Sequence, residues 1–351
     1  MIHRISQACL GLTLIVVACA PADPAPEAAA PLPSWTFTPD MIFPADGSLL
    51  KAEDGVVLPD GRVVVTDQAT GLRTVSADGT SQPFGHFAEV GYQHLPPEQA
   101  GGANGVAMEP DGSHILVADA FKGAIYRVEI ATEATTLVYQ HTFGVNTAVS
   151  DRSGGIWFTQ STRNTSEAEL WAAVAMATPD GALFYLPAGS GAGSAVQLVD
   201  SLEFANGVVL DEAAGLVYVA ETMGNRVLRF KIDPTGGVSE RTVALELDGP
   251  DNLERDGQGR LWVAQPLRTE VVVYDPATGF TQSVFRIATP ESEAAVAEIT
   301  RRREVGEPWL ELMAPPLWSP APGAITGMIL SPGNGPVYLT GLGNALIRLN
   351  R

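Results

Sequence analysis

Short apolar runs alternate with turns along most of the chain, and the alternation repeats. Each unit starts with a polar residue, continues through an apolar run and a turn, and returns through a β-rich run that ends on a polar residue. The polar residue precedes the turn glycine by 8 positions in four units and by 9 in another. Repeats of ~40–50 residues built from short strands are typical of propeller blades. The units begin at Glu53, Asn104, Asn146, Asn206, Asp251 and Thr326.

Six such units predict an all-β fold, a six-bladed β-propeller over residues 35–351. The first five leading residues are 51, 42, 60 and 45 positions apart. An all-β sandwich, or two domains of irregular strands, is the alternative, but a sandwich has no reason to repeat a polar residue at a fixed register. Because the last unit reaches the C-terminal Arg351, we expect residues Trp35 to Phe43 to supply a strand that closes the ring.

One segment breaks the repeat inside the longest interval, the 75 positions from Asp251 to Thr326. Residues 291–305 (ESEAAVAEITRRREV) are good helix formers with an arginine cluster near the end, which predicts one inserted helix. An apolar, proline-containing stretch follows. Since insertions between blades project at the rims, we expect Glu291 to Trp318 to cover the channel end that carries the chemistry. The alternative is packing on the outer face.

Composition and charge narrow the class of protein. With 36 Gly and 26 Pro in 351 residues, the chain is rich in turns, which argues against a helical bundle. Charged residues are only 17 %, unlike a disordered chain. The net charge of −19, with no basic stripe, argues against nucleic acid as a partner. Five His and two Cys leave little for a soft-metal site.

The first residues are expected to be a targeting signal rather than part of the fold. Arg4 precedes an apolar run, Ala8 to Val17, that is too short for a bilayer span and fits a signal peptide over residues 1–18. The run ends in Val-Val-Ala-Cys, which resembles a bacterial lipobox with Cys19 as the lipidated mature N-terminus. Residues 19–34 then read as an Ala/Pro-rich tether. An ordinary secretory signal that happens to contain Cys19 is the alternative.

Lipidation would place the protein in the cell envelope. Residue Ala20 follows Cys19 where an Asp commonly retains lipoproteins at the inner membrane. We therefore expect a lipid anchor in the outer membrane, with the protein facing the periplasm.

The leading polar residues form the candidate site. In a propeller the first strand of each blade lines the channel, so these residues face the axis at one end. Converging carboxylate and amide oxygens suit Ca²⁺, which takes 6–8 oxygens at ~2.3–2.6 Å. The alternative is that the Asn-Gly pairs at Asn104 and Asn206 only cap turns.

Four stretches carry a resemblance to a known family. FANGVVLDEAAGLVYVAETMGNRVLRF (204–230) and GPDNLERDGQGRLWVAQ (249–265) are the most specific, and KAEDGVVLPDGRVVV (51–65) and FGVNTAVSDRSGGIWFT (143–159) support them. They resemble the six-bladed propellers that include SMP-30/gluconolactonase (regucalcin), diisopropylfluorophosphatase, paraoxonase and strictosidine synthase-like proteins. The similarity covers roughly Trp35 to Arg351.

This resemblance implies a calcium ion held in the channel. Matched by motif, the ligands of the paraoxonase branch fall on Glu53, Asn146, Asn206, Asp251 and Asn252. Three positions depart from the family pattern. Asn104 stands where a histidine is proposed as a base, and Thr147 replaces a ligand of a second calcium for which Asp54 is kept. Thr326 lies in a sixth unit that lacks the glutamate of strictosidine synthase, which argues against amine–aldehyde condensation.

The predicted function is calcium-dependent hydrolysis of lactones or esters. The metal would polarise the carbonyl, and the carboxylate of Asp251 would activate water. Asn104, Thr326 and His141 are expected at the channel rim near the substrate, while His114 is expected to be structural. No G-x-S-x-G elbow occurs. The alternative is a non-catalytic propeller that binds a ligand or protein partner around a structural Ca²⁺.

The lipobox reading predicts that Cys19→Ser releases the protein from membranes or blocks its processing, because the thiol is the acylation site. Fractionation of cells expressing the wild type and the variant, followed by mass spectrometry of the mature N-terminus, measures this. Cys9→Ser is the control, because that cysteine would be removed with the signal. A wild-type protein found entirely in the soluble periplasmic fraction would refute the lipobox.

Overall fold

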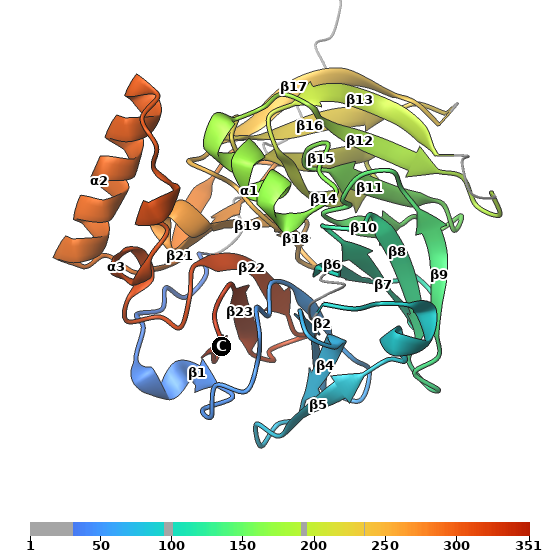
Figure 1. The fold of residues 1–351 in the computed structure, drawn as a ribbon, viewed down its shortest axis with the longest axis horizontal. Helices are drawn as coiled ribbons and strands as arrows, with labels where there is room; N and C mark the ends of the chain where they lie inside the picture. The colour runs from blue at the N-terminus through green and yellow to red at the C-terminus, as the bar shows by residue number, and fades with distance from the viewer. Residues whose placement is uncertain (1–30, 95–100, 191–194, 235) are drawn as a thin grey trace, which may run out of the picture.

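Six four-stranded antiparallel sheets form a ring in the computed structural model (Figure 1). The structure describes residues 31–94, 101–190, 195–234 and 236–351. Cys19 and the predicted signal peptide lie outside the described residues, as does most of the predicted tether. The predicted six-bladed β-propeller is confirmed.

In each blade four strands follow one another from the axis outward, and the innermost strand is named first. Blade one has β2 (Gly55–Val57), β3 (Val63–Asp67), β4 (Gly71–Val75) and β5 (Ser81–Phe84). Blade two has β6 (Ala103–Met108), β7 (His114–Asp119), β8 (Ala124–Glu129) and β9 (Thr135–Gln140). Blade three has β10 (Ala148–Ser150), β11 (Ile156–Gln160), β12 (Gly181–Leu186) and β13 (Val196–Leu202).

The second half of the ring follows the same scheme. Blade four has β14 (Ala205–Asp211), β15 (Leu216–Glu221), β16 (Arg226–Ile232) and β17 (Val238–Glu246). Blade five has β18 (Leu253–Arg255), β19 (Leu261–Gln265), β20 (Glu270–Tyr274) and β21 (Thr281–Arg286). Blade six has β22 (Ile325–Leu330), β23 (Val337–Gly341), β24 (Leu346–Leu349) and β1 (Ile42–Phe43).

The second strand of a blade is buried along its length. β3, β11, β19 and β23 have no exposed residue, because neighbouring blades cover both of their faces. Their sequences are therefore nearly continuous apolar runs rather than alternating ones. One cluster shows how blades pack, since it joins Trp262 of blade five to Met328 and Val337 of blade six. The hydrophobic core thus lies between blades.

The N-terminal strand closes the ring, as the sequence predicts. In β1, Ile42 pairs with Ile347 and Phe43 pairs with Leu346, so the outer strand of blade six comes from the other end of the chain. The ring of Phe43 lies 5.7 Å from that of Tyr338. Blade six is thereby fastened by both ends of the chain.

Helices gather on one face of the ring. The predicted inserted helix is α2 (Pro290–Val305), which begins with a capping box of Thr289 and Ser292 and ends at Gly306. Two further helices, α1 (Glu167–Met176) and α3 (Pro315–Trp318), correct the expectation of a single inserted helix. Short 3-10 helices occupy Pro39–Met41, Phe87–Val90, Pro266–Arg268 and Leu310–Leu312. No helix among the described residues is long and apolar enough to cross a membrane.

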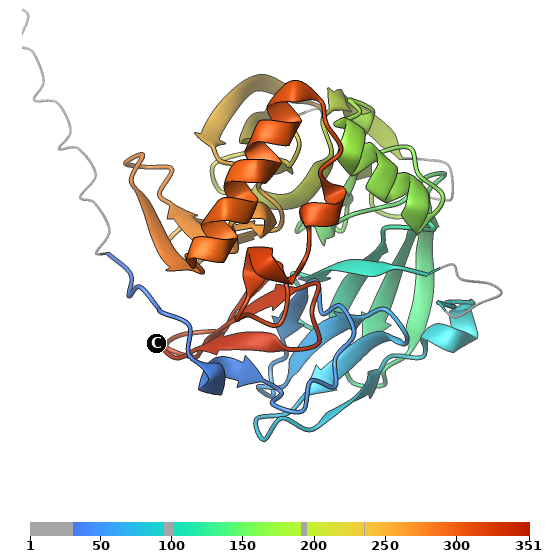
Figure 2. The same ribbon diagram turned by 60° about the vertical axis from the view of Figure 1, so that its left-hand side comes forward.

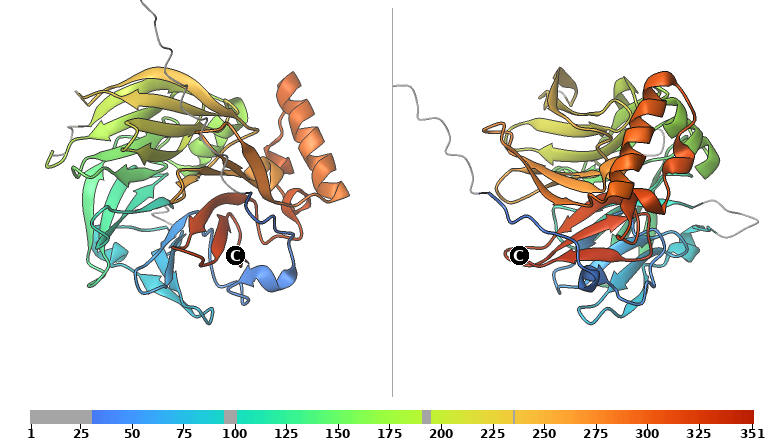
Figure 3. Two further views of the ribbon diagram at one scale, coloured as in Figure 1. Left: turned by 180° about the vertical axis from the view of Figure 1, so that it is seen from behind. Right: turned by 90° about the vertical axis from the view of Figure 1, so that its left-hand side faces the viewer.

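Helices α1 and α2 both lie over this face (Figures 2 and 3). One apolar cluster contains Leu170 and Val174 of α1 together with Ile299 of α2 and the buried Trp309. The described N-terminal residues begin at the other face, where Leu32 and Gln282 at the start of β21 exchange two hydrogen bonds of 2.9 and 2.7 Å. In the right-hand view of Figure 3 the helices and this segment lie on opposite sides.

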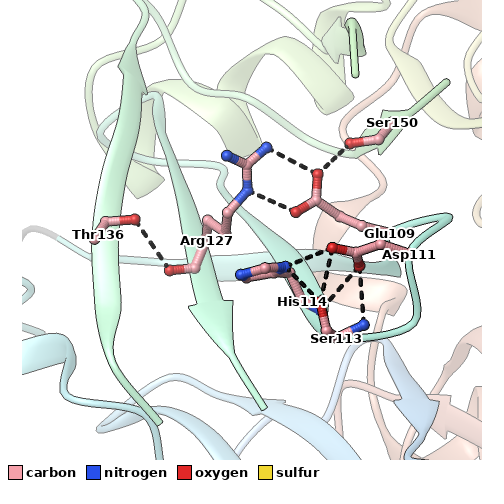
Figure 4. Close-up of polar contacts among 7 residues, drawn as sticks. All are labelled: Glu109, Asp111, Ser113, His114, Arg127, Thr136 and Ser150. Atoms are coloured by element: carbon pink, nitrogen blue, oxygen red, sulfur yellow. Dashed lines mark hydrogen bonds and ion pairs between the residues drawn. The ribbon is translucent and has the colours of Figure 1, made fainter. Parts of the chain in front are cut away.

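An ion pair of blade two is linked to blade three through its buried carboxylate (Figure 4). The Glu109 carboxylate accepts two hydrogen bonds from the Arg127 guanidinium, at 2.6 and 2.9 Å. It accepts a third, at 2.6 Å, from the Ser150 hydroxyl of the next blade. Three donors on one buried carboxylate offset its desolvation.

We expect Phe43→Ala to destabilise the fold by about 3 kcal/mol, because it removes a buried ring of β1 that packs against Tyr338 of blade six. Urea unfolding of the variant measures this. Phe280→Ala is the matched control, because Phe280 is 45 % exposed in a turn and its loss should change stability by less than ~0.5 kcal/mol. Equal losses in both variants would contradict the closure.

Candidate functional site

The leading residues of the six blades follow an alternating pattern. In the odd blades two polar residues precede the inner strand: Glu53-Asp54, Asn146-Thr147 and Asp251-Asn252. In the even blades a polar residue and a glycine lie inside the strand: Asn104-Gly105, Asn206-Gly207 and Thr326-Gly327. Each even strand has an irregular register at this point. Two kinds of blade therefore alternate around the axis.

The glycines of the even blades allow the next blade to come close. A Cβ atom on Gly105 would lie 2.7 Å from the Cα of Thr147, and one on Gly207 would lie 2.8 Å from the Cα of Asn252. Both distances are too short for carbon atoms. The Asn-Gly pairs thus lie in strands at close contacts between blades, and the alternative reading of them as turn caps is wrong.

Hydrogen bonds between neighbouring blades hold the ring together near the axis. The Thr326 hydroxyl donates to the backbone carbonyl of Glu53 at 3.0 Å, and the backbone N–H of Asn252 donates to the backbone carbonyl of Thr326 at 3.0 Å. On the other side, the Thr159 hydroxyl donates to the Asn206 carbonyl at 2.6 Å. The backbones that carry the site residues are therefore fixed to one another, which preorganises their side chains.

A cavity of about 120 Å³ lies at the helix-bearing end of the channel. Of the five predicted metal ligands, four border it: Glu53, Asn146, Asn206 and Asp251. The fifth, Asn252, lies against Glu53, with its Nδ2 atom 3.1 and 3.2 Å from the two carboxylate oxygens. The structure thus brings the predicted set together. Of the predicted rim residues, Asn104 and Thr326 border the same cavity.

Three buried oxygens of this set accept no hydrogen bond from any described residue. They are Oδ1 of Asn206, Oδ1 of Asp251 and Oδ1 of Asn252. A buried acceptor without a partner costs ~1–3 kcal/mol. A cation would satisfy such oxygens, and carboxylate and amide oxygens are the donors that Ca²⁺ prefers. Among the described residues, no three His, Cys, Asp or Glu side chains gather as a metal cluster, so the set depends on its asparagines.

Hydrogen bonds determine which amide atom faces the cavity. The Thr222 hydroxyl donates to the Pro250 carbonyl at 2.7 Å and accepts from Asn206 Nδ2 at 3.2 Å, which leaves Asn206 Oδ1 facing the site. Thr222 is a positioning residue that the sequence analysis missed, although it lies in the VAET stretch. Asn252 instead presents Nδ2 to Glu53. Rotating this amide by 180° would present Oδ1, the form that suits a cation.

Electrostatics at the floor of the cavity favour a bound positive charge. Burial raises the pKa of Glu53 well above its ordinary value, and the nearby carboxyls of Asp251 and Asp54 raise it further. Burial, with a further contribution from Asp54, raises the pKa of Asp251 to about 8 despite a hydrogen bond from Asn206. Burial raises the pKa of Asp54 to about 7. Without a cation, these carboxyls cannot all be ionised at neutral pH.

His141 does not reach the channel rim, and that prediction is wrong. It directly follows the outer strand β9, and its Nε2 lies 3.0 Å from Gln160 Oε1. Its ring packs edge-on against Phe184, with centroids 4.6 Å apart, and it borders a different cavity. The chain still has to return from the outer strand to the axis, which it reaches only at Asn146.

A Ser-His-Asp grouping on the opposite face is not a catalytic triad (Figure 4). Ser113 Oγ and Asp111 Oδ2 lie 2.9 and 2.8 Å from the same His114 nitrogen, Nδ1. A triad needs the serine and the aspartate on different ring nitrogens. This exposed turn is held by its own side chains, in agreement with a structural role for His114.

Apolar side chains form the walls of the cavity. Helix α1 contributes Leu170, Trp171 and Val174, and the inserted segment contributes Trp309 and Met313. The segment therefore covers the channel end, as expected from the sequence. The contribution of α1 was missed, although Ser166 and Glu169 form the Ser-x-x-Glu pattern of a helix start.

We expect the melting temperature in EDTA to fall as the pH rises from about 4 to 8. The folded pKa of Asp251 lies above its unfolded value, so the metal-free folded state binds more protons over this range and loses stability as they leave. Excess Ca²⁺ should reverse the loss, most strongly near pH 8. Glu53→Gln should weaken both effects. A melting temperature insensitive to Ca²⁺ at every pH would contradict a calcium site.

Comparisons with known proteins agree with the fold. Hemomucin, an adipocyte plasma membrane-associated protein of Drosophila melanogaster, is 27% identical over 172 residues, which are 45% of this chain and 29% of that protein. Protein STRICTOSIDINE SYNTHASE-LIKE 10 of Arabidopsis thaliana is 27% identical over 46% of this chain and 44% of its own length. The matches thus span less than half of these curated relatives.

Two solved structures share the architecture at low identity. A gluconolactonase of Xanthomonas campestris superposes with a TM-score of 0.60 at 17% identity, over 87% of each chain. Regucalcin of Agrobacterium tumefaciens, described as a calcium-binding protein, superposes with a TM-score of 0.60 at 16% identity, over 91% of this chain and 95% of its own. Residues 140–297 match the model of the SMP-30/Gluconolactonase/LRE-like region. The chain is therefore a six-bladed propeller whose residues 140–297 are similar to this family region.

Proposed function

We propose that this protein is a calcium-dependent hydrolase of lactones or esters. The observation that carries the proposal is the pair of unpartnered oxygens of Asn206 and Asp251 beside the Glu53 carboxylate, at one end of the channel, with the Asn252 side chain against the same carboxylate. The family match and the gluconolactonase neighbour support a lactone-type substrate. The regucalcin neighbour supports calcium.

Each site residue has a separate role in the proposed reaction. Glu53, Asn146, Asn206, Asp251 and Asn252 would hold the ion, which would polarise the substrate carbonyl and stabilise the oxyanion. Asp251 is the candidate base, because its carboxylate borders the cavity at the place of the ion, where the attacking water would lie. Thr222 keeps Asn206 turned toward the cavity. The rigid ring fixes these positions before substrate arrives.

The walls select the substrate class. Leu170, Trp171, Trp309 and Met313 offer an apolar surface above the polar floor. Such walls would exclude water and bind alkyl groups, which favours lipophilic lactones or esters over free sugars. Asn104 and Thr326 would contact the substrate near the reacting carbonyl.

The competing proposal is a propeller that binds a ligand or protein without turnover. It is favoured by Asn104, an amide that cannot transfer protons, at a position where the resemblance leads one to expect a histidine. Calcium would then be structural. Activity on a substrate panel separates the two proposals.

The position of the N-terminal segment supports a particular orientation for an anchored protein. Leu32 attaches at the face opposite the helices and the cavity. A lipid anchor at Cys19, if present in an outer membrane, would therefore leave the cavity mouth facing away from the bilayer and toward solutes of the periplasm.

We expect Asp251→Asn to lower kcat/KM on lactones by at least 100-fold with the propeller still folded, because the change removes both a metal charge and the candidate base. Aliphatic lactones, aldonolactones and aryl esters, assayed with EDTA and with Ca²⁺, measure this. Asp111→Asn is the control, an Asp→Asn change in an exposed turn on the opposite face, and should leave activity unchanged.

The variant also separates the two roles of Asp251. Activity still absent at saturating Ca²⁺, with the metal shown to be bound by calorimetry, would assign the base role. Recovery at high Ca²⁺ would assign a ligand role alone. Full activity of Asp251→Asn in EDTA, or no turnover of any substrate by the wild type, would overturn the proposed function.

A further inference from the structure

The cavity above the site shares a wall with a second, open groove. Val174 of α1, Met223 after β15 and Trp309 of the inserted segment border both spaces. The groove is about 1240 Å³, against about 120 Å³ for the cavity. A thin wall of three side chains therefore separates a small space from a large one.

The groove offers apolar surface beyond this wall. Met176 at the end of α1 is 70 % exposed, and Val243 of β17 is 47 % exposed, and both border the groove. Exposed large apolar side chains that line a groove are typical of ligand-binding surfaces. Two arginines of the groove are paired, since Arg268 and Arg303 both contact the Asp248 carboxylate, at 3.5 and 3.1 Å.

Trp309 is the largest member of the wall and is held from the groove side. The Arg303 guanidinium lies over its ring, 5.7 Å from the centroid. Arg303 is itself fixed by Asp248 and by the side-chain oxygen of Asn225, each at 3.1 Å. These contacts tie the end of α2 to blade four, so the indole, only 4 % exposed, is held in the wall.

We propose that Trp309 is the residue that limits the length of the apolar chain a substrate can carry. The cavity is close in size to an engineered cavity of ~150 Å³ that takes up benzene, so it suits a short alkyl group or a small ring. A longer chain meets the indole. Without the indole, it would pass between Val174 and Met223 into the groove. This inference rests on the proposed function for the substrate class, lipophilic lactones or esters.

Trp309→Ala tests the inference through chain-length preference. On lactones with alkyl substituents from methyl to decyl, we expect the wild type to lose kcat/KM beyond short chains. Relative to its own rate on the methyl substrate, the variant should gain about fourfold in kcat/KM per additional methylene group that leaves water, the factor corresponding to ~0.8 kcal/mol. The ratio of decyl to methyl kcat/KM should thus rise at least tenfold.

Trp318→Ala is the matched control. Trp318 belongs to the same apolar cluster but borders neither the cavity nor the groove, so its loss should leave the ratio unchanged. If Trp309→Ala does not fold, Val174→Ala thins the same wall from α1 and should shift the ratio in the same direction. An unchanged ratio in folded Trp309→Ala, or an equal shift in Trp318→Ala, overturns the inference.

A binding measurement separates this inference from the proposed function. Calorimetric titration with 1-butanol and 1-decanol in EDTA requires neither calcium nor turnover. Trp309→Ala should bind 1-decanol at least tenfold more tightly than the wild type, with 1-butanol little changed. If no variant hydrolyses any substrate, the proposed function fails, but the alcohol series still decides whether Trp309 limits chain length. Equal affinity of both proteins for 1-decanol overturns it.

Discussion

The burial of acidic and amide side chains at the axis is the constraint on which the rest of the structure depends. Six inner strands converge there, and Glu53, Asp54 and Asp251 lie too close together and too deep to be ionised at once without a counter-charge. A wholly apolar axis would satisfy packing equally well. Keeping carboxylates there, with amide oxygens left unpartnered, is a cost that a bound cation would offset.

The alternation of blades is how the backbone meets this constraint. The odd blades bring pairs of polar side chains to the axis, and the even blades bring one polar side chain and a glycine. Gly207 lets the backbone of Asn252 come close, and Gly105 does the same for Thr147. Any side chain at those glycines would push the donors of the neighbouring blade apart. The geometry of the site is therefore built by backbone contacts between blades.

The sequence predicts the features that every blade shares. Its predictions are incomplete or wrong for the segments that do not belong to the repeat. The register of leading residues predicts six blades and the ring around the cavity, because every blade must place its first strand at the axis. Helix α1 was missed because it lies within the 60-residue interval that starts at Asn146, where no segment was singled out as breaking the repeat. His141 was misplaced because nearness to Asn146 in sequence hides the path from an outer strand to the axis. The wall at Trp309 depends on contacts between segments far apart in the chain, which no local pattern contains.

The polar residues at the base of the cavity and the apolar residues of its walls come from different parts of the chain. Either group can therefore change without the other. The polar floor belongs to the inner strands, where a change in one blade disturbs its neighbours through the contacts at Gly105 and Gly207. The apolar walls come largely from α1 and from the segment around Trp309, which lie outside the strand repeat and share one apolar cluster with Phe204 and Leu267 of the blade ends. A change in the walls can alter which substrate fits without moving the oxygens of the floor. Substrate preference can therefore diverge while the chemistry of the site stays the same.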